Sequence, residues 1–117
     1  KKFSFKGKKQ KEIDRILNDT KLLENAGVFS IVLECVETKL SKKITKNIKI
    51  PTIGIGSSSN CDGQVLVIDD LIGMSDSKFK FVKKYVDVSK TINSAVKKYK
   101  NEVKKKQFPK AKHSFAN

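Results

Sequence analysis

Histidine and cysteine are rare in this sequence. Both are common zinc ligands, and cysteine alone forms disulfides. Histidine occurs once, at His113, and the only cysteines are Cys35 and Cys61. Structural zinc sites take four Cys or His ligands, and disulfide-framed folds need several cysteine pairs. We therefore expect neither a zinc centre nor a disulfide framework. The two cysteines are expected to be reduced thiols that fill small buried spaces in a cytoplasmic protein.

Arginine is nearly absent, although the chain is strongly basic. Arg15 is the single arginine among 26 basic residues, and the formal net charge at pH 7 is +14. Arginine supplies the two-pronged hydrogen bonds that read DNA bases, and lysine does not replace it in that role. The lysines are also spread over every segment, without a stripe that carries interleaved aromatic residues. We therefore expect no nucleic-acid partner.

Long apolar runs are missing as well. No run approaches the roughly 18 residues of a membrane-spanning helix, and the first residues do not form the pattern of a secretory signal peptide. We therefore expect no membrane partner. The chain starts at Lys1 rather than with methionine, which predicts that it is part of a longer gene product.

The apolar residues switch between helical and extended spacing along the chain, which predicts alternating helices and strands. Gly27 is placed to end the first helix, and Thr38 and Asp87 are placed to cap two later ones. Short connections between such units favour parallel strands. The predicted order is a helix and then three strand–helix units: helix 11–26, strand 28–33, helix 38–47, strand 51–56, helix 61–73, strand 79–85 and helix 87–106, with a tail at 107–117 that contains His113.

Segment 61–73 permits two interpretations. Residues Val65–Ile68 alone would suit a strand. However, Asp62 is a good helix N-cap, the apolar residues after it recur at helical spacing, and Gly73 suits a helix end. We predict a helix, because a helix here preserves the strict alternation of strands and helices.

The stretch Ile50–Gln64, with the sequence IPTIGIGSSSNCDGQ, is a candidate binding region. Its apolar strand is expected to lie parallel to strand 28–33 and to open into a loop of small polar residues. Parallel α/β sheets keep their ligand sites at such strand ends. Gly56 and Ser57 are therefore candidates for substrate binding. The same glycine spacing also fits close packing of a helix on the strand.

Glu34 stands where the preceding apolar strand ends. A carboxylate in this position is expected to be partly desolvated, which raises its pKa and its basicity. Glu34 is therefore a candidate general base. The alternative is that Glu34 merely begins a solvated loop, as we expect for Glu37. Asp69 and Asp70 are expected to face solvent or to cap a helix.

These stretches together resemble the ketopantoate hydroxymethyltransferase family. Glu34 lies within IVLECV, which is followed by IPTIGIG and then by CDGQVLV with Asp70 and Gly73. The resemblance covers essentially the whole chain. It implies an α/β fold in which this chain is the C-terminal portion of a (β/α)8 barrel, from the fifth helix to the eighth. Further matching stretches are Gly7-Lys8, Leu23-Glu24-Asn25-Ala26-Gly27, Phe81-Val82-Lys83-Lys84-Tyr85, Phe108-Pro109 and His113-Ser114-Phe115.

The resemblance also implies a reaction. Enzymes of this family transfer a hydroxymethyl group from 5,10-methylenetetrahydrofolate to 3-methyl-2-oxobutanoate, which gives 2-dehydropantoate in pantothenate biosynthesis. Glu34 matches the base that removes the proton next to the keto group. The family's Mg²⁺ is held by carboxylates of the N-terminal half, so no metal ligand is expected in this chain. Further expected partners are that N-terminal half and other subunits of a homo-oligomer, a decamer in the family.

Two departures from the family pattern stand near the expected site. Gly56-Ser57-Ser58 replaces the usual Gly-Ala-Gly, and Asp69 stands where the family often has histidine.

Three strands cannot close an eight-stranded barrel, which takes about 250 residues, so we expect the chain to be inactive alone. Residue patterns without the resemblance also fit a small basic α/β module that binds an anionic ligand through loop 56–62, or an acidic partner.

Overall fold

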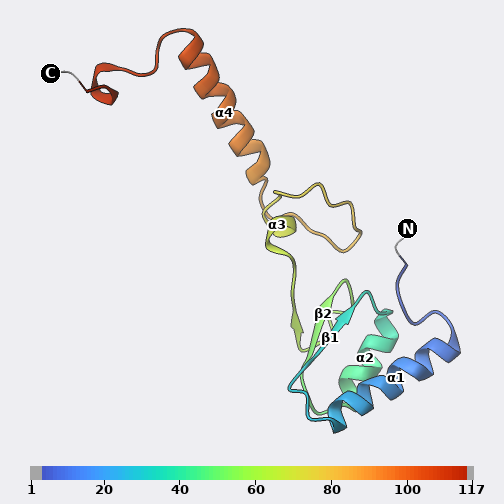
Figure 1. Ribbon diagram of the computed structural model, residues 1–117. Helices are drawn as coiled ribbons and strands as arrows, with labels where there is room; N and C mark the ends of the chain where they lie inside the picture. The colour runs from blue at the N-terminus through green and yellow to red at the C-terminus, as the bar shows by residue number, and fades with distance from the viewer. Residues whose placement is uncertain (1–3, 116–117) are drawn as a thin grey trace. The chain divides into compact units, whose positions relative to one another are not determined.

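The computed structural model describes residues 4–115 and contains two compact units. The first unit comprises the chain up to Val67 together with Lys78–Val82, and the second comprises Ile68–Ser77 together with the chain from Lys83 onward. Figure 1 traces the elements of both units along the chain. No helix within residues 4–115 combines the length and the apolar character that a bilayer-spanning segment requires.

A three-stranded parallel sheet organises the first unit. Its strands are β1 (Ile31–Glu34), β2 (Thr52–Ile55) and β3 (Gly63–Gln64), in the order β1-β2-β3. β1 and β2 pair along their whole length, with Leu33 opposite Gly54. This confirms the prediction that the first two strands are adjacent and parallel, although β1 starts later than the sequence suggested.

Two helices, α1 (Gln10–Asn25) and α2 (Thr38–Asn47), lie side by side on one side of this sheet (Figure 1). Apolar side chains of α2 and β1 form the core, and partly buried residues of α1 pack against it. Removal of this apolar surface from water is the main stabilising contribution in a small unit. The buried core residues are Ile31, Leu33, Val36, Leu40, Ile44, Ile48 and Cys61. Both cysteines are free and buried, as expected.

Local contacts at the helix ends fix where α1 stops and where α2 begins. Gly27 follows the C-cap of α1 with a φ of +84°, so its predicted role at this helix end is confirmed. The N-cap of α2 is Glu37, whose carboxylate accepts a hydrogen bond from the N–H of Leu40 at 3.0 Å. The prediction of Thr38 as this cap is wrong, because Thr38 is already the first helical residue.

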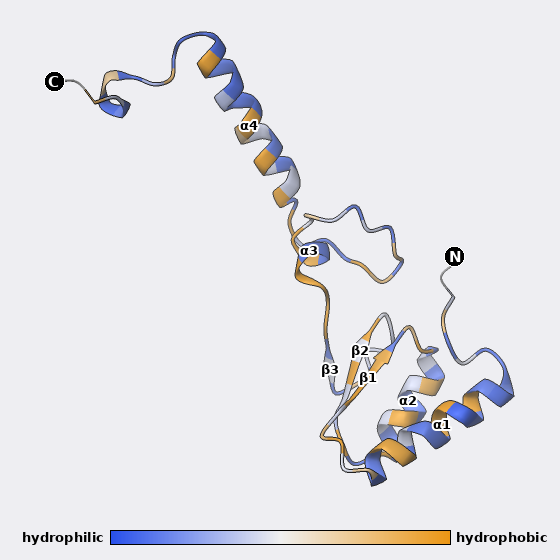
Figure 2. Ribbon diagram, viewed as in Figure 1, coloured by the Kyte–Doolittle hydropathy of each residue, from blue (hydrophilic) through white to orange (hydrophobic). Residues whose placement is uncertain are grey.

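The second unit contains α3 (Ile68–Leu71), α4 (Val88–Lys104) and a 3-10 turn at Ala111–His113. Asp87 caps α4 as predicted, because its carboxylate accepts a hydrogen bond from the N–H of Lys90 at 2.9 Å. Apolar residues recur along α4 at helical spacing, as the coloured bands of Figure 2 show. Within the described chain this apolar stripe is largely exposed; it includes Ile92, Val96, Tyr99 and Val103.

Segment 61–73 does not form the predicted helix. It contributes β3, an extended stretch and the single turn of α3, so the alternative strand at Val65–Ile68 is not found either. Asp62 explains the difference, because its carboxylate caps no helix. It accepts hydrogen bonds from the backbone N–H of Thr52 at 2.8 Å and from the Thr52 hydroxyl at 3.1 Å. These bonds hold the chain beside β2, where Gly63–Gln64 pairs with it.

The predicted strand at 79–85 is also wrong, since the structure shows turns and irregular backbone there. The N–H of Val82 donates a hydrogen bond to the carbonyl oxygen of Phe79 at 3.0 Å, which bends the chain. The rings of Phe79 and Phe81 stack with their centres 5.5 Å apart. The alternating aromatic spacing in the sequence therefore reflects a ring stack rather than a strand.

Candidate active site

Glu34, the predicted base, is the last residue of β1. The side chains of β1 alternate: Ile31 and Leu33 are buried, whereas Val32 and Glu34 are exposed on the other face. The expected partial desolvation of the carboxylate is therefore not found, because no part of the described chain covers this face of β1. Glu34 nevertheless stands at the C-terminal end of a parallel sheet, where α/β enzymes place catalytic groups.

Apolar side chains accompany Glu34 on this surface. The parallel register places Ile55 beside Glu34 and Ile53 beside Val32. Paired residues of neighbouring strands point to the same face of a sheet, and Val32 is 59% exposed. We call this surface, made of Val32, Glu34, Ile53 and Ile55, the open face.

Gly56 directly follows β2 and has a left-handed backbone, with a φ of +63°. A β-carbon at this position would lie 2.8 Å from the ring of Phe81 and 2.9 Å from the sulfur of Cys35. Close approach of these two side chains accounts for glycine here, whereas the predicted packing of a helix against the strand is not found at this position, because neither Phe81 nor Cys35 lies in a helix. Burial, together with the charge of Glu34, raises the pKa of the Cys35 thiol. A protonated thiol is a poor nucleophile, which agrees with a space-filling role for Cys35.

Ser57 contacts the backbone on both sides of Glu34. Its hydroxyl donates a hydrogen bond to the carbonyl oxygen of Leu33 at 2.7 Å and accepts one from the N–H of Val36 at 3.0 Å. A hydroxyl has one proton to donate, and Leu33 already receives it. Towards a substrate, Ser57 therefore offers only an acceptor lone pair.

Gly56 and Ser57 line a pocket of about 720 Å³ beside the C-terminal ends of β1 and β2. This volume lies within the range of small-molecule sites. Residues 79–81, two stacked phenylalanines with Lys80 between them, form part of its wall. The structure thus brings Gly56 and Ser57 together, whereas Glu34 is not among the lining residues and stands on the open face.

Comparison with known proteins decides which family this arrangement belongs to. The family model for ketopantoate hydroxymethyltransferase matches residues 1–111. The chain belongs to the ketopantoate hydroxymethyltransferase family. Two relatives, both named 3-methyl-2-oxobutanoate hydroxymethyltransferase, come from Pelagibacter ubique and Carboxydothermus hydrogenoformans. They are 59% identical over 113 residues and 53% identical over 114 residues, respectively.

The alignments cover 97% of this chain but only 44% of the Pelagibacter ubique relative and 41% of the Carboxydothermus hydrogenoformans relative. A third relative of the same name, from Geobacter metallireducens, is 49% identical over 115 residues and is covered to 43%. The chain therefore spans less than half the length of these ketopantoate hydroxymethyltransferases. The match confirms the resemblance on which the sequence assignment relied.

The family's Mg²⁺, whose ligands are expected in the N-terminal half, would find no complete set of protein donors among the described residues. Among residues 4–115, no three His, Cys, Asp or Glu side chains gather closely enough to hold a metal ion. Mg²⁺ prefers several oxygen ligands in a near-octahedral arrangement. We therefore derive no step of the ketopantoate hydroxymethyltransferase reaction through a metal bound by the described residues.

Loop 56–62 is poorly suited to an anion, the alternative use of this region. Ser58 is only 2% exposed, and the Ser57 hydroxyl already donates its proton to the carbonyl oxygen of Leu33 in β1. Asp62 adds a negative charge, and its hydrogen bonds from the N–H and then the hydroxyl of Thr52 lower the pKa of its carboxyl. The geometry of loop 56–62 therefore favours a role in a hydroxymethyltransferase over a role as an independent anion-binding module.

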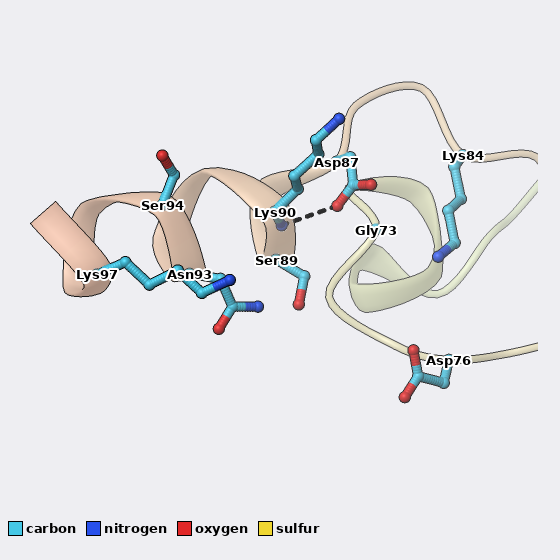
Figure 3. Close-up of a pocket in the computed structure, with 9 residues that line it drawn as sticks. All are labelled: Gly73, Asp76, Lys84, Asp87, Ser89, Lys90, Asn93, Ser94 and Lys97. Atoms are coloured by element: carbon cyan, nitrogen blue, oxygen red, sulfur yellow. Dashed lines mark hydrogen bonds between the residues drawn. The ribbon is translucent and has the colours of Figure 1, made fainter.

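A second pocket lies against the start of α4 in the second unit, as Figure 3 shows. Its lysines, Lys84, Lys90 and Lys97, share it with the carboxylates of Asp76 and Asp87. The carboxylate of Asp87 already accepts the N–H of Lys90 at 2.9 Å. The side chains in Figure 3 do not converge on one point, so this pocket does not form a second candidate site.

Proposed function

We propose that this chain is part of an enzyme that transfers a hydroxymethyl group from 5,10-methylenetetrahydrofolate to 3-methyl-2-oxobutanoate, giving 2-dehydropantoate for pantothenate biosynthesis. Family membership and the names of the relatives support the reaction. The single structural observation that carries the proposal is the position of Glu34 at the C-terminal end of β1. Parallel α/β enzymes build their active sites at this end of the sheet.

In the proposed reaction, Glu34 acts as the general base. Its carboxylate takes the proton from the carbon next to the keto group, and the electron pair of that C–H bond remains on the substrate as an enolate. Water adds to the one-carbon unit of the folate, and both of its C–N bonds break, so that tetrahydrofolate leaves with the two protons of water on its nitrogens and the carbon remains as formaldehyde. The enolate carbon then bonds to the formaldehyde carbon while the C=O electron pair moves to oxygen. This alkoxide takes the proton from Glu34, which gives the new hydroxyl group and returns the carboxylate to its starting state.

The open face acquires its function when the rest of a (β/α)8 barrel covers it. In such a barrel, alternate side chains of every strand point into a packed interior. Val32 and Glu34, with Ile53 and Ile55 beside them, then face inward from two neighbouring strands. Covering this face supplies the desolvation that Glu34 lacks in the described chain, and desolvation makes a carboxylate a stronger base.

The remaining parts of the proposal depend mainly on groups outside the described residues. The N-terminal part of the barrel provides the carboxylates for Mg²⁺, and the folate and the keto acid bind between the two parts. Gly56 and Ser57 line the pocket beside the strand ends, where we expect the keto acid to bind. We place the enzyme in the cytoplasm as a homo-oligomer.

The test is exchange of the hydrogen next to the keto group with deuterated water, followed by NMR in the absence of folate. In the full-length enzyme that carries this segment, Glu34→Gln keeps the shape and removes the basicity. We expect exchange to fall roughly 10²- to 10⁴-fold, with little change in substrate binding. Asp19→Asn, the same type of change on the exposed surface of α1, is the matched control and should exchange at the wild-type rate. A folded Glu34→Gln protein with wild-type exchange would rule out Glu34 as the base.

A further inference from the structure

One hydroxyl group closes the bend that leads the chain out of β1. The Ser57 hydroxyl donates to the carbonyl oxygen of Leu33 and accepts from the N–H of Val36. In a closed β-turn, the carbonyl of the first residue and the N–H of the fourth residue bond directly to each other. Here the hydroxyl stands between these two groups, and the two central residues are Glu34 and Cys35.

The bend that Ser57 spans is not a relaxed conformation. Cys35 has a φ of +51°, a region that residues with a β-carbon seldom occupy. Such a conformation persists only where surrounding contacts hold it. The N–H of Cys35 donates to the carbonyl of Ile55 at 2.9 Å, and its carbonyl accepts from the N–H of Lys6 at 2.8 Å. The two hydrogen bonds of the Ser57 hydroxyl, which comes from the loop after β2, add to these backbone bonds and hold the bend as well.

We propose that Ser57 is a positioning residue for Glu34. Its hydroxyl fixes the bend after β1 and thereby holds the Glu34 carboxylate at the reacting carbon of the keto acid. The inference rests on the proposed function, because it takes Glu34 to be the base. Small displacements of a reacting group are expensive in rate, since a shift of about 1 Å can lose roughly 10²-fold. This role is specific to the Gly56-Ser57-Ser58 sequence of this chain, in which a serine stands where the family usually has alanine, and it differs from the direct substrate contact that the sequence suggested for Ser57.

Ser58 provides a matched comparison one residue further along the chain. It is 2% exposed, and its hydroxyl accepts hydrogen bonds from the N–H and the side-chain amide of Asn60, at 3.1 and 2.8 Å. These contacts remain within its own loop and do not reach the bend between Leu33 and Val36. Removal of this hydroxyl therefore disturbs the same loop to a similar extent without releasing Glu34.

The experiment compares Ser57→Ala, Ser57→Thr and Ser58→Ala in the full-length enzyme, using the same deuterium exchange with 3-methyl-2-oxobutanoate. We expect Ser57→Ala to lower the exchange rate at saturating keto acid about 5- to 50-fold, with KM unchanged within about twofold. Ser57→Thr retains the hydroxyl and should stay within about threefold of the wild type. Ser58→Ala should exchange at the wild-type rate.

Several results would overturn the proposal. Wild-type exchange in Ser57→Ala would show that the bend needs no hydroxyl. An increase in KM without a lower maximal rate would show direct substrate contact instead. A loss that Ser58→Ala shares, or that Ser57→Thr does not restore, would show general damage to the loop. Wild-type exchange in Glu34→Gln would reject the proposed function itself. If Glu34→Gln loses exchange but Ser57→Ala exchanges at the wild-type rate, only the positioning role of Ser57 is rejected.

Discussion

The Asp62 carboxylate, next to β3, accepts hydrogen bonds from the N–H and the hydroxyl of Thr52 in β2. The strength of this contact depends on the charge of the carboxylate. The hydrogen bond from the Thr52 N–H, followed by that from its hydroxyl, lowers the pKa of the Asp62 carboxyl. A carboxyl with a lowered pKa in the folded state contributes stability above its ordinary pKa. That contribution is lost as the pH falls through the lowered value, because the unfolded chain then binds more protons.

We therefore expect Asp62→Asn to be less stable than the wild type at neutral pH, and expect the difference to narrow in acid. The measurement is the free energy of unfolding in urea for both full-length proteins at about pH 7 and about pH 3. A difference that stays constant between the two pH values would show that the charge of Asp62 does not contribute to the contact.

Gly56 and Gly27 allow steric crowding to be separated from backbone strain. Both have positive φ, but a β-carbon at Gly56 meets Phe81 and Cys35, whereas one at Gly27 meets nothing within 4 Å. We expect Gly27→Ala to lose about 1 kcal/mol from strain alone and Gly56→Ala to lose about 2–4 kcal/mol. Denaturant unfolding of the two variants provides the measurement. Equal losses would contradict the close packing at Gly56.

α1 and α2 were predictable because their apolar residues recur on the face that packs on the core, and α4 was predictable from the same spacing although its apolar stripe is largely exposed in the described chain. α2 buries Leu40 and Ile44 on one face, as the period of the sequence indicates, and its C-cap residue Ile48 belongs to the same core. The segment 61–73 was not predictable in this way, because a hydrogen bond from Thr52 to Asp62 overrides its helical spacing. Local patterns contain no information on a partner that lies in another strand.

The candidate site was also predictable from the sequence only in part. The position of Glu34 at a strand end follows from the apolar run before it, and the structure places it there. The contacts of Ser57 with Leu33 and Val36 join residues 24 and 21 positions apart, a spacing that matches neither a helix nor a tight hairpin. The sequence therefore indicates which residues carry polar groups at this edge, and only the fold shows what these groups bind.

The start of α2 offers a test at the level of one element. Glu37 accepts the N–H of Leu40, and the hydrogen bonds from the first turn lower the pKa of its carboxyl. We expect Glu37→Ala to lower the melting temperature of the full-length protein clearly, and Thr38→Ala, the matched neighbour, to change it much less. Thermal unfolding followed by circular dichroism is the measurement. A larger fall in melting temperature for Thr38→Ala than for Glu37→Ala would show that Thr38 is the N-cap.

At the level of the whole molecule, the chain has one part of what the reaction needs. It spans 44% of the Pelagibacter ubique relative, and its three strands leave Glu34 exposed on the open face. We expect the 117-residue chain, purified alone, to show neither deuterium exchange nor hydroxymethyl transfer. Both assays are read by NMR against the full-length enzyme. Turnover by the chain alone would contradict the proposal that the reaction needs the remainder of the enzyme.

The edge position of β1 also bears on how such a segment behaves in a cell. Within the described residues β1 has a neighbour on one side only, and its outer face combines Val32 with the adjacent isoleucines of β2. Strands with a free edge and an apolar face template the pairing of further strands. We therefore expect this segment, if it is produced without the remainder of the proposed enzyme, to form insoluble, β-rich aggregates.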